Sequence, residues 1–268
     1  MRARNDGSPT ARVSLDLGLT ISDVLLYTEG ALLPDGQTLS WSVVEHVAHG
    51  ETSCFAIEQN EARKITVFSE ATGRAYSLMA TPRAPTFVNG GFTMHRIVGI
   101  DPYEDTQRKI RAVAPVRGRV LDTVTGLGYT AIEAAKTANE VVTVELDPLV
   151  LNLARLNPWS RQLFAAPNIH QIIGDTFDII QTFDDQSFAL AIHDPPTLSL
   201  AGDLYSGDYY RQLFRVLQRG GRLFHYIGNL ESQHGARVST GVIRRLKDAG
   251  FARVLRRNEA FGVVAQKT

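Results

Sequence analysis

The chain has little of what defines several common protein classes. It contains one cysteine in 268 residues, Cys54, so it cannot form an internal disulfide, and no metal-ligand spacing surrounds that residue. No apolar run approaches the roughly 20 residues of a membrane-spanning helix. The first residues also lack the apolar core of a signal peptide. We therefore expect a cytoplasmic protein that binds no metal.

The sequence also lacks an excess of either charge. Its 28 Lys and Arg balance 28 Asp and Glu. Proteins that bind nucleic acids usually concentrate positive charge, which releases counterions from the phosphates. The balanced total gives no strong nucleic-acid signature. It makes a nucleic-acid substrate less expected but does not exclude one. The length is sufficient for one large domain or for a large and a small one.

The most informative segment is residues 119–147, RVLDTVTGLGYTAIEAAKTANEVVTVELD. It predicts a strand closing at Asp122, a turn with Gly126 and Gly128, a helix, and a second strand that ends at Glu145. Such a unit presents backbone amides and a helix N-terminus to a ligand, while an acid about 20 residues further on accepts hydrogen bonds from ribose hydroxyls. The pattern predicts a nucleoside site, although Gly-x-Gly alone can simply tighten a turn.

Further predicted elements follow in a regular order. A strand precedes Gly174-Asp175, a fourth strand closes with His193-Asp194-Pro195-Pro196, and a fifth strand follows an amphipathic helix. A helix and two more strands end the chain. The ranges of these elements are Ile169 to Ile173, Tyr209 to Leu217, Gly220 to Tyr226, Val238 to Ala249, Ala252 to Arg256 and Gly262 to Gln266.

From about Ile110 to Thr268 this order resembles the class I S-adenosylmethionine-dependent methyltransferases, in particular predicted archaeal-type methyltransferases with an Asp-Pro-Pro motif. The resemblance implies a doubly wound α/β fold, with a seven-stranded Rossmann-like sheet whose last strand is antiparallel. The first motif of that family is an acid followed by Gly-x-Gly-x-Gly. Here Val124 replaces its first glycine, which narrows the space beside the methionine portion of the ligand.

The resemblance also implies a set of cofactor contacts to S-adenosylmethionine. Glu145 would hold the ribose with Leu146 beside it, and Asp175 would lie near the adenine amino group with Thr176 lining the ring. Asp194 would lie beside the sulfonium. The expected cofactor-binding residues are Asp122, Thr123, Gly126, Gly128, Glu145, Leu146, Asp175, Thr176 and Asp194.

Asp194-Pro195-Pro196-Thr197 resembles the Asp/Asn-Pro-Pro-aromatic motif of methyltransferases that modify nitrogen atoms. In those enzymes the acid and a proline carbonyl orient the target amine. Thr197 stands in the aromatic's place, so stacking on the target is unsupported. We expect Asp194 to act on the acceptor as orienter or base. His193, Pro195, Asp203 and Tyr205 are expected to face the substrate. Alternatively, His193 is a buried core histidine, and Asp203 and Tyr205 only lead into a helix capped by Ser206.

A second resemblance competes with the first. Residues 194–217 are similar to the corresponding segment of spermidine synthase-like aminopropyltransferases, which also carry a small β domain in front of the same fold. Their glycine motif typically reads Gly-Gly-Gly-Asp, whereas Tyr129 stands where the acid would be, which favours the ordinary methyl donor. A non-catalytic nucleoside-binding module that assembles on RNA or protein is a third alternative.

The amino-terminal third shows short alternating segments separated by turns such as Pro34-Asp35-Gly36. We therefore predict a β-rich domain over residues 1–80, a connecting segment or lid over 81–104, and the S-adenosylmethionine-binding domain over 105–268. A small amine, a protein or an RNA remains open as the acceptor, and a homodimer is possible.

Overall fold

The computed structural model describes all residues from 1 to 268, and the chain forms two compact units. Unit 1 comprises Met1–Pro102 together with Asn152–Trp159, and unit 2 comprises Tyr103–Leu151 together with Ser160–Thr268. The division after Pro102 lies close to the predicted start of the nucleoside-binding domain at residue 105. No helix is both long and apolar enough to span a membrane.

Unit 1 is β-rich, as predicted. One antiparallel sheet has the order β1-β2-β3-β4, a second has the order β10-β9-β8-β7, and β5 and β6 form a separate hairpin. The bounds are α1 (Arg2–Asn5), β1 (Thr10–Val13), β2 (Ser22–Tyr27), β3 (Gly30–Leu32), β4 (Thr38–Ser40), α2 (Trp41–His49), β5 (Phe55–Glu58), β6 (Glu61–Lys64), β7 (Thr66–Ser69), β8 (Arg74–Met79), β9 (Thr86–Asn89) and β10 (Phe92–Thr93).

Two features of unit 1 differ from the sequence-based expectation. Residues 41–49 form helix α2, so the alternating segment expected around Thr38 to Val43 is a strand only from Thr38 to Ser40. Ser40 caps this helix by accepting a hydrogen bond from the Val43 amide, and Val43 and Val44 pack on the core around Val24. Residues 86–93 lie within the predicted connecting segment or lid, but they form the β9–β10 hairpin, which extends the sheet begun by β7 and β8.

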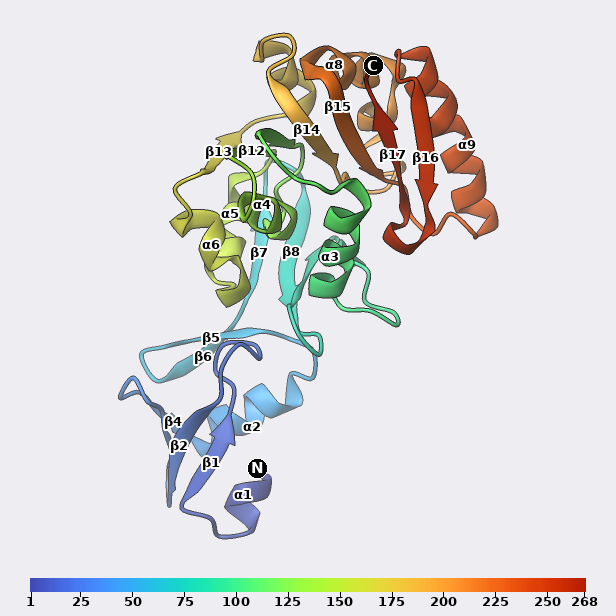
Figure 1. Ribbon diagram of the computed structural model, residues 1–268. Coiled ribbons are helices and arrows are strands. Elements are labelled where there is room, and N and C mark those ends of the chain that lie inside the picture. Colours follow the sequence, from blue (N-terminus) through green and yellow to red (C-terminus); the bar gives the residue numbers. More distant parts are fainter. The chain divides into compact units, whose positions relative to one another are not determined.

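Unit 2 contains the predicted seven-stranded sheet, with the order β13-β12-β11-β14-β15-β17-β16. Strands β11 to β15 are parallel, and β17 runs antiparallel to both β15 and β16 (Figure 1). The bounds are β11 (Arg119–Asp122), β12 (Glu140–Glu145), β13 (Ile169–Ile173), β14 (Phe188–His193), β15 (Leu217–Tyr226), β16 (Arg253–Arg257) and β17 (Gly262–Gln266). The predicted doubly wound fold class is thus confirmed.

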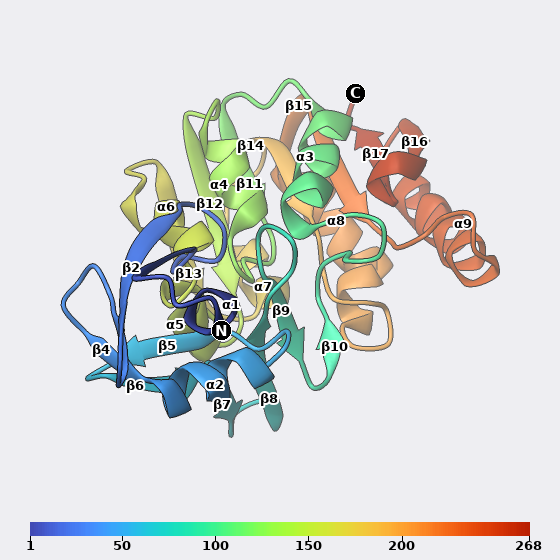
Figure 2. The same cartoon turned by 90° about the horizontal axis from the view of Figure 1, so that it is seen from below.

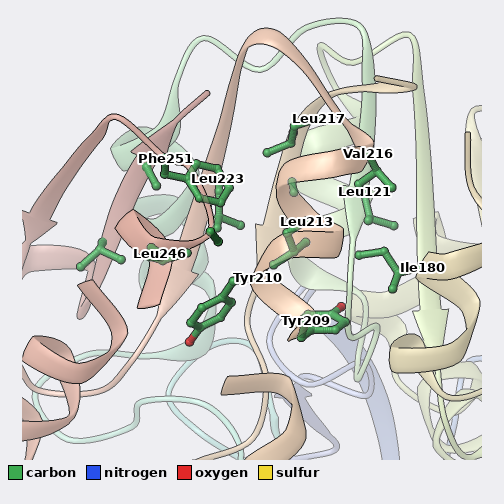
Figure 3. Close-up of a cluster of buried hydrophobic side chains, with 14 of the residues drawn as sticks. Leu121, Ile180, Tyr209, Tyr210, Leu213, Val216, Leu217, Leu223, Leu246 and Phe251 are labelled. Atoms are coloured by element: carbon green, nitrogen blue, oxygen red, sulfur yellow. The ribbon is translucent and has the colours of Figure 1, made fainter. Parts of the chain in front are cut away.

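The central strands consist of nearly continuous apolar residues because both faces of the sheet are covered. The bounds of the helices in this part of the chain are α3 (Pro102–Val113), α4 (Tyr129–Ala135), α5 (Pro148–Arg155), α6 (Arg161–Ala165), α7 (Thr176–Ile179), α8 (Gly207–Val216) and α9 (Gln233–Asp248), with short 3-10 turns at η1 (Pro158–Ser160), η2 (Ile180–Thr182), η3 (Gly202–Tyr205) and η4 (Asn258–Ala260). Figure 3 shows the core, in which Leu213 and Val216 of α8 and Leu246 of α9 lie with Leu121 and Leu223 of the sheet.

Candidate active site

Three adjacent strands bring the predicted site residues to one edge of the sheet. Strands β12, β11 and β14 are parallel neighbours, so their carboxyl ends meet there. Glu145 ends β12, the glycine turn follows β11, and Asp194 follows β14. Since neighbouring strands lie about 4.8 Å apart, the backbones of Glu145 and Asp194 are separated by about 10 Å, with the glycine turn between them.

The glycine turn closes on Glu145. The Gly126 amide donates a hydrogen bond to Glu145 Oε2 at 2.9 Å. Gly126 and Gly128 have φ values of +53° and +77°, which disfavour a side chain. A Cβ on Gly128 would lie 2.7 Å from Leu163, whereas one on Gly126 would meet no atom within 4 Å. Gly128 is therefore required for packing, whereas the space beside Gly126 is open.

Glu145 is buried at the carboxyl end of β12. Its Oε1 accepts a hydrogen bond from the Asp147 amide at 3.2 Å, and its Oε2 accepts the one from Gly126. Burial raises the pKa of Glu145 to about 7, although these amides oppose the rise. The next residue, Leu146, is 59% exposed, an unusual position for a large apolar side chain beside a buried acid. Contact of this pair with a ribose and an adjoining base stays a prediction.

Asp122 and Thr123 lie beneath the turn. Asp122 is fully buried and accepts hydrogen bonds from the hydroxyls of Thr130 at 3.0 Å and Thr143 at 2.7 Å. These bonds connect β11, β12 and α4. The Thr123 hydroxyl is 2.7 Å from His193 Nδ1. Both residues thus shape the turn, and their contact with a cofactor stays a prediction.

Asp175 and Thr176 lie after β13 on the same edge. Asp175 is exposed and caps α7 by accepting a hydrogen bond from the Phe177 amide at 2.8 Å. Thr176 is buried, with its hydroxyl 2.9 Å from that of Tyr209, and the Phe177 ring stacks on Tyr209. Asp175 is therefore the accessible member of this pair, and its role toward adenine stays a prediction.

The structure adds an ion-paired trio that sequence reasoning missed. Lys109 Nζ lies 2.7 Å from Asp194 Oδ2 and 2.8 Å from Asp105 Oδ2. The side chain of Lys109 is 2% exposed and that of Asp105 is 0% exposed, whereas that of Asp194 is 18% exposed. The ammonium also lies 4.5 Å from the ring centroid of Tyr226.

These contacts determine the protonation of the trio. Burial alone would lower the pKa of Lys109, but Asp194 and Asp105 raise it above its ordinary value, so Lys109 is a cation. Burial raises the pKa of Asp194, and the Lys109 cation opposes that rise. Lys109 occupies Oδ2 of Asp194, and Oδ1 has no hydrogen-bond partner. Oδ1 of Asp194 is therefore free to accept a further hydrogen bond.

One local signal could have revealed part of this trio. Asp105 and Lys109 are spaced i,i+4 on α3, and Pro102 stands at the first position of that helix. Because residues 81–104 were predicted to be a connecting segment or lid, the start of this helix was missed.

The remaining predicted substrate residues have structural partners. His193 Nε2 lies 2.9 Å from the Leu204 carbonyl, which can only accept, so Nε2 carries the proton and Nδ1 accepts from Thr123. Burial lowers the pKa of His193 to about 3, so the ring is neutral. His193 thus has the features of the buried core histidine that the sequence left as an alternative.

The segment after Asp194 leads into helix α8. Pro195 is buried, and Tyr205, 2% exposed, donates a hydrogen bond to the Pro196 carbonyl at 3.1 Å. Asp203 is exposed on η3. Ser206 caps α8 by accepting a hydrogen bond from the Tyr209 amide at 3.1 Å, as the alternative interpretation predicted. Contacts of these residues with a substrate stay predictions.

Comparison with known structures agrees with the fold. A spermidine synthase in complex with the transition state analogue AdoDATO aligns with a TM-score of 0.63 at 16% identity, over 81% of this chain and 80% of that chain. A protein assigned as an S-adenosyl-L-methionine-dependent methyltransferase from Methanococcus maripaludis aligns with a TM-score of 0.44 at 17% identity, over 62% and 86% of the two chains. The chain thus has the Rossmann-like fold of the spermidine synthase, as the resemblance seen in the sequence predicted.

No family model matches the chain. It is 44% identical over 239 residues to the uncharacterized protein MJ1233 of Methanocaldococcus jannaschii, over 88% of this chain and 81% of that protein. The chain belongs to the family of MJ1233. It is also 30% identical over 148 residues to the polyamine aminopropyltransferase of Aeropyrum pernix, over 52% of this chain and 44% of that enzyme. No group of three or more His, Cys, Asp or Glu side chains is arranged to hold a metal ion.

Proposed function

We propose that this protein is an enzyme that transfers a methyl group from S-adenosylmethionine to a nitrogen atom of an acceptor. The observation that carries the proposal is the pair of acids Glu145 and Asp194, which lie at the carboxyl ends of β12 and β14 on either side of the open glycine turn. In this assignment Glu145 accepts hydrogen bonds from the ribose and Asp194 faces the acceptor. The separation of about 10 Å leaves room for the ribose, the sulfonium and the attacking nitrogen between them.

The chemistry requires positioning and a place for one proton. The nitrogen lone pair attacks the methyl carbon in line with the carbon–sulfur bond. That bond breaks, its electron pair goes to sulfur, and S-adenosylhomocysteine leaves. The nitrogen must lose a proton, which Oδ1 of Asp194 accepts directly or through water. Lys109 is a positioning residue in this scheme, since its bond to Oδ2 fixes the orientation of the carboxylate.

A second candidate function is aminopropyl transfer from decarboxylated S-adenosylmethionine. It is favoured by the spermidine synthase that aligns over 81% of the chain and by the 30% identity to a polyamine aminopropyltransferase. The glycine turn argues against it, because Leu127 and Tyr129 are buried apolar residues and no acid stands between Thr123 and Gly128. An acid in that turn is what the aminopropyltransferase motif supplies.

Calorimetric titration separates the two functions. Binding of S-adenosylmethionine and S-adenosylhomocysteine, each tighter than that of decarboxylated S-adenosylmethionine and methylthioadenosine, is the expected result. The opposite order of affinities would indicate aminopropyl transfer in place of methyl transfer. Asp194→Asn should keep donor affinity and lose transfer. If this variant keeps full transfer activity, Asp194 does not act on the acceptor.

A further inference from the structure

Charge is unevenly distributed along this neutral chain. Residues 233–257 contain seven Lys and Arg and one Asp, a net charge of +6 in a chain whose total is zero. This segment consists of helix α9, the connection after it, and strand β16. The balanced total therefore conceals one strongly cationic region.

These cations are not neutralised by the protein. Several arginines elsewhere in unit 2 form ion pairs, such as Arg211 with Asp208 and Arg215 with Asp185. No ion pair is formed by six cations of α9 and β16, and all except the half-buried Arg257 are exposed. The six are Arg237, Arg244, Lys247, Arg253, Arg256 and Arg257. Together they form what we call the α9–β16 basic surface.

The six side chains surround one free edge of the sheet. Arg237, Arg244 and Lys247 are spaced i, i+7 and i+10, which places them on one stripe of α9. Strand β16 is the last strand of the sheet, and α9 lies beside it in both views (Figures 1 and 2). Val254 packs in the core cluster shared with α9, so alternation places Arg256 on that face of the sheet and Arg253 and Arg257 on the other.

The strand register connects this surface to the candidate active site. His193 pairs with His225, and in the next row Tyr226 pairs with Gly262, which pairs with Arg257. Arg257 therefore lies at the same end of the strands as Asp194. The two residues are three strands apart, a separation of about 15 Å. An extended ligand on the basic surface can reach Asp194.

The composition of the surface favours a phosphate backbone over a protein partner. None of the exposed large hydrophobic side chains of the protein lies within residues 233–257. Protein interfaces are centred on buried aromatic and apolar side chains, whereas contacts to phosphates require mainly cations. A surface with exposed cations and no exposed large apolar side chains therefore indicates a polyanionic partner.

The candidate active site favours RNA over duplex DNA. An enzyme that modifies a base within a duplex must flip that base and hold it by stacking. Thr197, which stands in the place of the stacking aromatic, is exposed, and its hydroxyl lies 3.1 Å from that of Ser199. Unpaired bases of RNA loops are already accessible.

We propose that the α9–β16 basic surface binds the phosphate backbone of a structured RNA. It thereby presents an unpaired base to Asp194, a step that rests on the proposed function. The proposal thus names both a binding surface and the class of acceptor.

The experiment compares two triple charge reversals in the full-length protein. Arg237→Glu, Arg244→Glu and Arg256→Glu alter the basic surface. Lys64→Glu, Arg117→Glu and Arg161→Glu change the total charge equally at exposed positions outside it. Binding of bulk tRNA and of a duplex DNA of matched length is measured by fluorescence anisotropy over a range of salt concentrations.

The wild type should bind tRNA with a steep salt dependence. The surface variant should lose at least about 10-fold in affinity, and its log–log salt slope should fall by about 2 to 3, whereas the control should stay near the wild type. Equal losses of affinity in both variants, or no loss in either, would overturn the proposal that the α9–β16 basic surface binds RNA. Equal affinity for duplex DNA would overturn the assignment to RNA.

Donor titration separates this proposal from the proposed function. The surface variant should bind S-adenosylmethionine as the wild type does, which also shows that it is folded. If it does not, Arg244→Glu with Lys247→Glu replaces it in the same comparison. Wild-type donor binding without tRNA binding refutes the RNA surface alone. Surface-dependent tRNA binding without donor binding refutes the methyltransferase alone.

Discussion

Lys109 is held between two carboxylates with almost no exposure to solvent. Removal of one member of a buried ion-paired group leaves an uncompensated charge, which is far more costly than loss of a surface pair. The trio should therefore contribute to stability as well as to the orientation of Asp194.

Lys109→Met should lower the free energy of unfolding by about 3–5 kcal/mol, because Asp105 and Asp194 would then face each other without a cation. Urea denaturation measures this change. Arg111→Met is the matched control, since Arg111 lies on the same helix and pairs at the surface with Glu104, and its loss should be much smaller. Asp105→Asn in the Lys109→Met background should recover part of the stability. Equal losses from Lys109→Met and Arg111→Met would contradict the buried-pair argument.

Glu145→Ala should weaken S-adenosylmethionine binding by about 1.5–3 kcal/mol for each charge-assisted hydrogen bond that is lost. Glu140→Ala serves as the control, because Glu140 lies at the other end of the same strand and pairs with Arg119. Isothermal titration measures both affinities. Unchanged affinity in Glu145→Ala would remove Glu145 from the site.

At the scale of elements, the glycine turn separates a binding role from a packing role. Gly126→Ala meets no atom, so it should cost only the strain of a left-handed residue, about 1–2 kcal/mol, while its methyl group enters the space kept for the ligand. Gly128→Ala carries the same strain and also collides with Leu163. We therefore expect Gly126→Ala to reduce donor affinity more and Gly128→Ala to reduce stability more.

Thermal unfolding and donor titration of both glycine variants check this expectation. Leu163→Ala should offset part of the stability loss in Gly128→Ala, because it removes the atoms that collide. If both variants lose affinity and stability in equal proportion, the two glycines have no separate roles.

Elements with strong local signals were predicted well. Strands β11 and β12 are continuous apolar runs on either side of the glycine turn and α4. The capping residue Ser206 marks the start of α8. Helix α9 begins at Gln233, earlier than predicted, because Ser232 caps it and extends a first turn with little apolar periodicity. Helix α2 was missed because its core-facing residues are valines, which also suit a strand.

Only those residues of the candidate site that belong to short sequence motifs were predicted. Glu145, Gly126 and Asp194 follow from motifs at strand ends. The pairing of Lys109 with Asp194 joins residues 85 positions apart, so no local pattern could reveal it. The bond from Thr123 to His193, which explains why His193 is part of the core, likewise depends on β11 and β14 being neighbours.

At the scale of the whole molecule, stability should depend on pH through Asp122. Burial raises the pKa of Asp122 from 3.8 to about 7, in spite of the hydrogen bonds from Thr143 and Thr130. Between these values the native state holds a proton that the unfolded state has released, so stability should fall as the pH rises through this range. Glu145, with its pKa near 7, acts in the same direction.

Asp122→Asn should flatten this pH dependence, since the amide does not titrate. Urea denaturation at pH values below and above the range gives the two stabilities for each protein. Asp23→Asn, at an exposed position on β2, should leave the difference unchanged. A wild-type protein that gains stability from pH 4 to pH 7 would show that other groups determine the dependence.

Strand β16 ends the sheet, and its outer side pairs with no strand. An unpaired strand edge is a template on which another copy of a protein can add a strand, and positive charge on the edge is one way in which proteins prevent this. Arg253, Arg256 and Arg257 stand on that edge, so their mutual repulsion would keep two copies apart. Substitution of these arginines by uncharged β-branched residues would therefore do more than remove cations. It would turn the end of the sheet into a site of self-assembly and favour aggregation.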